Sequence, residues 1–483
     1  MHHSGLLTAF VVYLVLLFLI AAYAARIQPA QSLQAYYLGN RGLGGCLLAM
    51  TLTTSYISAS SFIGGPGAAY HYGLGWVAVA MIQLPVVWFT LGVLGKKFAI
   101  LARRYQAITL NDLLYARYQS GLLVCLSSIS LLIAFFATMT VQFIGAARLL
   151  QTVLGLPYGH SLLIFGATIS LYTLIGGFRA MVLTDLLQGF IMLVGSGLLL
   201  QGVITAGGGL AHTIHTLQQI DPQLITPGGA QAVLTAPLLC SFWIVVCFGT
   251  LGLPHTATSC MAYKNSRAMH QAMVIGTLVL GIVMLAMHLS GTLGRALFPD
   301  LLVPDQIIPT LMMSVLSPIA AGIFLAAPLS AIMSTVDAQL LQCSATVIND
   351  LYLRYDPQAR EQPQRLARYS RAVILLLSLL LLLAAWHPPQ LLIWLNLFAF
   401  GGLQVVFLWP LVLGLYWPAA NATGALSSFL AGVGSYLCFS ALSLKLWGFQ
   451  PIVPALLISL GAFYGGNRWG IYQARRDLII SPR

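Results

Sequence analysis

The chain has 483 residues, of which 59% are hydrophobic and only 7% are charged. Soluble domains carry roughly a quarter charged residues, so this composition excludes a soluble enzyme or binding domain of this length. The formal net charge of +12 is poor evidence for nucleic-acid binding, because the basic residues are scattered over short loops between apolar runs. The composition therefore predicts an all-α, polytopic membrane protein.

Apolar runs of about 20 residues predict the membrane spans. The first run lacks the basic start of a cleavable signal sequence, and it is long enough to cross a bilayer. About thirteen spans are expected, at residues 5–25, 46–69, 74–96, 121–151, 160–178, 181–206, 233–260, 269–294, 318–348, 371–386, 390–416, 424–443 and 452–472.

The distribution of Lys and Arg predicts the orientation of these spans. With the N-terminus outside and the C-terminus inside, only Arg148, Arg295 and Lys445 of the 22 basic residues fall on or near the outer side. This split follows the positive-inside rule, and an even number of spans would destroy it. Because the loops are short, residues 1–483 are expected to form a single transport domain. Its expected parts are 1–45 (first span and inner loop), 46–206 (first five-helix repeat), 233–416 (second repeat) and 424–483 (last two spans and tail).

Helix-breaking residues interrupt the second and seventh spans. The second contains Gly64-Gly-Pro-Gly67 after a run of Ser and Thr, and the seventh contains Phe248-Gly-Thr-Leu-Gly-Leu-Pro-His255. Irregular backbone is tolerated in a bilayer only where it lines a cavity or is buried in protein. Their separation of five spans fits an inverted repeat of five helices. Close helix packing by small residues is the alternative.

Polar side chains within the sixth and ninth spans are candidates for an ion site. Ser334, Thr335 and Asp337 lie together in an apolar helix, where they are costly unless they have a function. Hydroxyls and freed carbonyls suit Na⁺, but the hydroxyls could instead bond their own backbone. Asp185 is either an interfacial acid paired with Arg179 or a station for a departing cation.

Five motifs resemble those of the sodium:solute symporter family, and the resemblance extends over about residues 10–470. These motifs are Tyr37-Leu-Gly39 with Arg41, Ile57-Ser-Ala59 with Phe62-Ile-Gly64, Gly176-Gly-Phe-Arg-Ala180 with Thr184-Asp185, Ala331-Ile-Met-Ser-Thr335 and Leu413-Gly-Leu-Tyr-Trp417. Further stretches are similar to the pantothenate-carrying branch of the family, among them Gly252-Leu-Pro-His-Thr256 and Leu392-Ile-Trp-Leu-Asn396.

The resemblance implies an inverted-repeat core in spans two to eleven and sodium as the coupling ion and only metal. The implied sodium ligands are the carbonyls of Thr54, Ile57 and Ala331 and the hydroxyls of Ser334 and Thr335, with Asp185 on the inner exit path. The implied substrate-binding residues are Tyr56, Ser58, Ser61, Cys247, Thr250, Asn396 and Gln404. Proline carriers have an acidic residue at the position of Tyr56, and sugar carriers have other residues at the positions of Cys247 and Thr250. The resemblance therefore implies a solute other than proline or sugar. The role of Asp337 stays open.

The expected function is sodium-coupled import of pantothenate, a small carboxylate, by alternating access in a bacterial inner membrane. The lipid bilayer and the solute are the expected partners. Neither a nucleic acid nor an obligate protein partner is expected. One alternative is a family member that carries a different carboxylate. A sensor with the same fold is disfavoured, because the chain ends about ten residues after its last expected span. An intramembrane enzyme would need a paired catalytic constellation, and the sequence offers none.

Overall fold

The computed structural model describes residues 2–27, 33–387 and 392–480. Pro388 and Pro389, which separate two expected spans, lie outside the described residues, as do part of the expected first inner loop and the end of the tail. Within the described ranges every regular element is a helix, in agreement with the predicted all-α class.

The first half of the chain contains two long helices, α9 and α10, preceded by a series of shorter ones. The elements are α1 (His2–Ile27), α2 (Leu33–Leu38), α3 (Gly45–Tyr56), η2 (Ser60–Gly64), α4 (Gly65–Tyr72), α5 (Leu74–Met81), α6 (Val86–Phe89), η3 (Thr90–Gly95), α7 (Lys96–Arg104), α8 (Leu110–Tyr118), α9 (Gly121–Leu154), α10 (Tyr158–Ala206) and α11 (Leu210–Ile220).

The second half also contains both short and long helices. Its elements are α12 (Ala236–Val246), η6 (Phe248–Gly252), α13 (Pro254–Ser259), α14 (Ser266–Leu297), η7 (Pro304–Gln306), α15 (Ile307–Val315), α16 (Pro318–Ala345), η8 (Thr346–Tyr352), α17 (Leu353–Tyr355), α18 (Pro363–Ala384), α19 (Leu392–Tyr416), α20 (Ala422–Ala441) and α21 (Ile452–Ile480).

Among the described residues, nine stretches are long and apolar enough to cross a bilayer, and one bent helix pair makes a tenth. They coincide with the expected spans two to six and eight to twelve. Two shorter apolar helices, Thr8–Ala24 and Ala236–Gly252, coincide with the expected first and seventh spans. The expected last span lies in α21. Thirteen crossings stay a prediction, because length and apolarity together establish only nine or ten.

The second span is broken, as predicted, but the break lies at Ile57, before the helical Gly64-Gly-Pro-Gly67 motif. Gly45–Tyr56 and Ser60–Tyr72 meet at an angle of 69°, and Ile57 between them has an extended backbone (φ −71°, ψ 124°). The break frees backbone groups that water cannot reach. Gln142 on α9 accepts one of them, because the Ala59 N–H donates to its Oε1 over 2.8 Å.

The seventh span is also broken, between Val246 and Pro254. Cys247 leaves helical geometry (φ −124°, ψ −77°), and Leu253 is extended before α13 begins at Pro254. A glutamine again replaces a lost helical bond, since Gln404 Nε2 on α19 donates to the Val245 carbonyl over 2.6 Å. Each break is therefore held by an amide side chain from another helix.

The fifth and sixth spans are joined almost without a loop. They form one continuous run of 49 residues, α10, whose direction changes at Gly177. Gly177 has φ 59° and ψ −170°, a conformation that L side chains rarely adopt, so glycine is required there. The two predicted spans are thus separate stretches, Tyr158–Ile175 and Gly177–Ala206.

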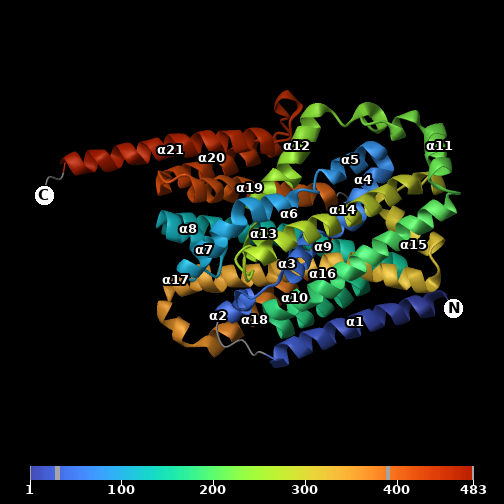
Figure 1. The fold of residues 1–483 in the computed structure, drawn as a ribbon, viewed down its shortest axis with the longest axis horizontal. Coiled ribbons are helices and arrows are strands. Elements are labelled where there is room, and N and C mark those ends of the chain that lie inside the picture. The colour runs from blue at the N-terminus through green and yellow to red at the C-terminus, as the bar shows by residue number, and fades with distance from the viewer. Residues whose placement is uncertain (1, 28–32, 388–391, 481–483) are drawn as a thin grey trace.

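The long helices lie side by side, with α16 in the middle of the molecule and α1 and α21 at opposite edges (Figure 1). The ninth span, which contains α16, is the most enclosed of the candidate spans, with 83% of its apolar window buried. It packs against α10, α1, α9 and α3. A helix in this position can bring polar groups together far from water.

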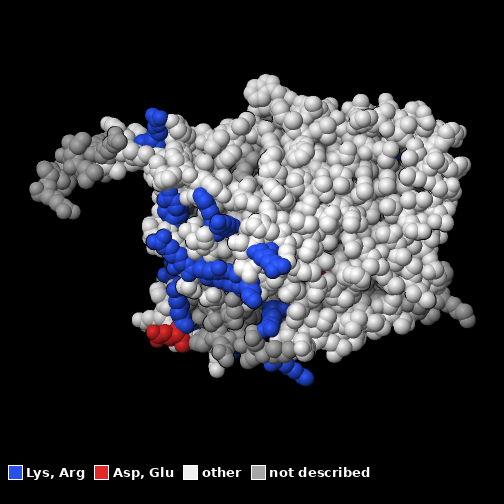
Figure 2. Space-filling view, in the orientation of Figure 1, with Lys and Arg blue, Asp and Glu red and all other residues white. Residues whose placement is uncertain are grey.

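Basic side chains gather at one end of the molecule. Figure 2 shows Lys and Arg at the end where Figure 1 places α7, α8 and α17, while the rest of the visible face carries almost none. The first helix begins at the opposite end from the one where α21 finishes (Figure 1).

At the basic end, two cations fasten the C-terminal turn of α19. Arg117 donates to the carbonyls of Gly414 and Trp417 over 2.8 and 3.0 Å. Lys97 Nζ donates to the Leu415 carbonyl over 2.9 Å and lies 3.5 Å from the ring centroid of Tyr416. The last carbonyls of a helix have no partner within it, so this end of α19 is tied to α7 and α8.

Candidate functional site

The expected sodium ligands meet between α3 and α16. Ser334 Oγ donates to the Thr54 carbonyl over 2.9 Å. Thr335 Oγ1 lies 3.0 Å from the Ile57 carbonyl and 2.9 Å from the Ala331 carbonyl. All five predicted ligands thus lie at the break of the second span. The two hydroxyls are buried, each with an exposed fraction of 1%.

This arrangement supplies what a hard cation needs. The break turns the carbonyls of Thr54 and Ile57 away from helical partners, and α16 places two hydroxyls opposite them. The Ser55 carbonyl, which the sequence did not suggest, lies 3.4 Å from Thr335 Oγ1. Both hydroxyls also reach the Ala331 carbonyl on their own helix, so the self-bonding alternative describes part of the same geometry.

Asp185 is buried inside the molecule. Its carboxylate faces Thr51 and Thr54 of α3, but neither oxygen makes a well-formed hydrogen bond among the described residues. The exposed fraction of Asp185 is 0%, and both roles expected for it stay predictions.

Asp337 is a second buried carboxyl close to Asp185. It faces Tyr172 and Thr173 of α10, and its Oδ1 has no hydrogen-bond partner among the described residues. Asp337 therefore faces a neighbouring helix and lies near the candidate ion site, and its role stays open.

A central cavity of about 70 Å³ lies beside the break of the second span. Five of the seven expected substrate residues line it: Tyr56, Ser58, Ser61, Thr250 and Asn396. The Tyr56 hydroxyl lies 2.9 Å from Gln83 Oε1 and 2.8 Å from the Val246 carbonyl. The phenol of Tyr56 thus links the two broken spans across the cavity.

The other two expected residues, Cys247 and Gln404, are not among those that line this cavity. Cys247 is fully buried at the break of the seventh span. Gln404 Nε2 donates its hydrogen bond to the Val245 carbonyl, as described above. Both residues therefore lie at the break of the seventh span without lining the central cavity.

Several lining residues were missed as candidates. Gln83 and His288 are polar residues in spans, but a lone glutamine or histidine in a membrane helix is usually taken to bond a neighbouring helix. His288 Nδ1 instead lies 2.8 Å from the Met284 carbonyl of its own helix, α14, while its ring also lines the cavity. The aromatic lining residues could not be told from ordinary apolar span residues; they are Trp76, Phe242 and Phe400.

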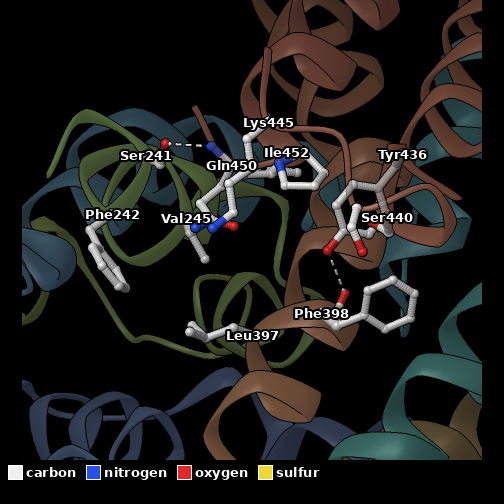
Figure 3. Close-up of a pocket in the computed structure, with 12 residues that line it drawn as sticks. Ser241, Phe242, Val245, Leu397, Phe398, Tyr436, Ser440, Lys445, Gln450 and Ile452 are labelled. Carbon is white, nitrogen blue, oxygen red and sulfur yellow. Dashed lines mark hydrogen bonds between the residues drawn. The ribbon is translucent and has the colours of Figure 1, made fainter. Parts of the chain in front are cut away.

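A vestibule of about 240 Å³ adjoins the central cavity. The two share Phe242, Val245 and Leu397. Figure 3 shows Lys445 and Gln450 on one side of the vestibule, with Phe242 and Leu397 on the other. Lys445 is one of the few basic residues expected on the outer side, and it lines the vestibule beside the central cavity.

The profile of the sodium:solute symporter family matches residues 36–432, and the chain belongs to this family. It is 60% identical over 474 residues, 98% of each chain, to a protein of Escherichia coli (strain K12) named sodium/pantothenate symporter. It is 55% identical over 468 residues, 96% of each chain, to a protein of the same name from Haemophilus influenzae. These relatives are transporters, not enzymes.

Solved structures show the same fold at low sequence identity. A Na⁺-coupled sialic acid symporter in a substrate-bound outward-open state superposes with a TM-score of 0.82 at 15% identity, covering 96% of this chain and 98% of that one. A nucleobase-cation-symport-1 family transporter gives a TM-score of 0.53 at 16% identity, covering 91% and 96%.

Proposed function

We propose that the protein imports pantothenate together with sodium. The observation that carries this proposal is the 60% identity, over 98% of both chains, to a sodium/pantothenate symporter. The site supports it, because five oxygen ligands converge at the break of the second span and a polar cavity adjoins them. Sodium is the coupling ion.

The proposed topology has thirteen spans, an outside N-terminus and an inside C-terminus, in a bacterial inner membrane. The gathering of basic side chains at one end of the molecule supports this orientation (Figure 2). The pair of breaks, five spans apart and each held by a glutamine, supports an inverted repeat in spans two to eleven.

Sodium and solute are proposed to act on the same broken helix. Sodium bound between α3 and α16 fixes the break in the shape that Tyr56, Ser58 and Ser61 need to line the cavity. A ligand shifts a conformational equilibrium only by its difference in affinity between the two states. Release of sodium past Asp185 then removes the stabilisation of the outward state. The residues keep their proposed roles: Thr54, Ile57, Ala331, Ser334 and Thr335 as ligands, and Asp185 on the exit path.

The charge of the solute explains why coupling is needed. Pantothenate is an anion at neutral pH, and each elementary charge moved across 100 mV is worth about 2.3 kcal/mol. A negative cell interior therefore opposes its entry. At least one sodium ion moving inward with it cancels that opposition.

Uptake of labelled pantothenate into proteoliposomes tests the proposal. Uptake should require an inward sodium gradient and should fall when unlabelled pantothenate is added in excess. If sodium drives uptake of another carboxylate that pantothenate does not displace, the protein is a carrier of that other solute and the pantothenate proposal is wrong.

A further inference from the structure

His255 is a buried imidazole whose hydrogen-bonding capacity is unused. It lies in the first turn of α13, directly after the break of the seventh span, and its exposed fraction is 4%. Neither ring nitrogen has a hydrogen-bond partner among the described residues. An unsatisfied buried polar group is costly, so native proteins rarely retain one without a reason.

Two aromatic rings pack against the imidazole. It meets Phe135 of α9 edge to face, with ring centroids 5.6 Å apart. It lies against Phe400 of α19 at 6.0 Å. Phe400 lines the central cavity on its other side. One phenyl ring therefore separates His255 from the site where the solute is proposed to bind.

His255 also lines a second, smaller cavity on the side of Phe400 away from the central cavity. This inner cavity of about 30 Å³ lies among α3, α13 and α16, and Ser55, Thr258 and Gln342 line it as well. The Gln342 side chain is oriented by Thr258, whose hydroxyl donates to its Oε1 over 2.7 Å. Its Nε2 then has no hydrogen-bond partner among the described residues.

Two unused polar groups from different helices thus meet at one cavity. A neutral imidazole offers one N–H donor and one acceptor, and the amide nitrogen of Gln342 offers two donors. This set suits a carboxylate or hydroxyl group. The cavity has room for about one water molecule as it stands, so a larger solute reaches it only when the inner side opens.

We propose that His255 and Gln342 form an exit subsite that binds the polar end of the solute after it passes Phe400 toward the inner side. This inference rests on the proposed function and extends it, because it assigns residues to the route between the central cavity and the cell interior. The subsite gives the solute hydrogen-bond partners at the moment when it leaves those of the central cavity.

The test compares the two faces of the membrane. His255→Phe keeps an aromatic ring between Phe135 and Phe400 and removes both nitrogens. The half-saturating pantothenate concentration is measured at the outer face by uptake into right-side-out vesicles and at the inner face with inside-out vesicles. We expect about a tenfold rise at the inner face, equivalent to about 1.4 kcal/mol, and less than a twofold change at the outer face.

Thermal stability in detergent separates this role from a structural one. Removing an unpaired buried polar group should leave Tm unchanged or raise it. A fall in Tm with equal changes at both faces would mean that a water-mediated structural bond was lost, and would overturn the inference. An unchanged inner-face concentration would also overturn it.

A second variant keeps the inference testable if His255→Phe does not reach the membrane. Gln342→Met removes the unused donor from α16, and the same rise confined to the inner face is expected. In both experiments the unsubstituted protein must carry pantothenate. If it does not, the proposed function fails, whereas a working protein with symmetric variants refutes only the exit subsite.

Discussion

Replacing both hydroxyls of the candidate sodium site is expected to raise the sodium concentration needed for uptake. Ser334→Ala with Thr335→Ala removes two of five oxygen ligands and leaves the carbonyls in place. Each hydroxyl is worth about 0.5–1.5 kcal/mol net, so the pair is worth about 1–3 kcal/mol. At 1.4 kcal/mol per factor of ten, half-saturation by sodium should rise about 5- to 150-fold.

The assay is initial pantothenate uptake measured over a series of sodium concentrations. Ser344→Ala is the matched control, because Ser344 is also buried on α16 but bonds Tyr37 and Ser370 instead of the second span. Its sodium dependence should match that of the unsubstituted protein. An unchanged half-saturation in the double variant, or an equal rise in the control, would refute the site.

Two further predictions concern the C-terminal half of the broken second span. Gly291→Ala should lower uptake at least tenfold per transporter, because a Cβ there would overlap the Pro66 carbonyl. Gly434→Ala is the control, since its Cβ would meet open space and uptake should not fall. Equal losses of uptake in the two variants would contradict this prediction. Asp305 packs against Gly67, and burial raises its pKa to about 6. The protonated form is therefore favoured in the folded protein, and this stabilisation is lost as pH rises from about 4 through 6. At pH 7, Asp305→Asn should raise the free energy of unfolding by about 1 kcal/mol after solvent screening, and Tm should rise with it. Near pH 4 the substitution should leave Tm unchanged. Equal Tm shifts at both pH values would contradict the raised pKa of Asp305.

The sequence predicts features that depend on local chemistry. The break of the seventh span follows from Pro254, because proline disrupts a helix. The break of the second span is predicted within the right segment, but it lies at Ile57, and Gly64-Gly-Pro-Gly67 after it is helical. The hydroxyls of Ser334 and Thr335 are neighbours in sequence, so one break facing α16 brings them both to the same carbonyls. Ten of the expected spans coincide with apolar stretches in the structure for the same reason.

Features that depend on which way a helix faces are predicted less well. Cys247 and Gln404 were expected to bind the solute, yet neither is among the residues that line the central cavity, and the Gln404 amide donates to the Val245 carbonyl. Gln142 could not be recognised as the residue that holds the second span, because its partner is 83 residues away. The burial of Asp185 likewise depends on the turn at Gly177, which the pattern of charges does not reveal.

Because α19 is tied at its C-terminal end, the helix can tilt about that end. Its 25 residues measure about 37 Å at 1.5 Å per residue. With the C-terminal turn tied by Arg117 and Lys97, a tilt of about 5° leaves that end in place and moves the other by about 3 Å, together with Tyr436 of α20, whose hydroxyl donates to the Phe398 carbonyl near that end. Asn396 lies near the moving end, and Gln404, which holds the seventh span, lies near the middle. Small rotations at the fixed end thus become displacements comparable to a hydrogen bond at the cavity wall, while the bond to the seventh span moves about half as far.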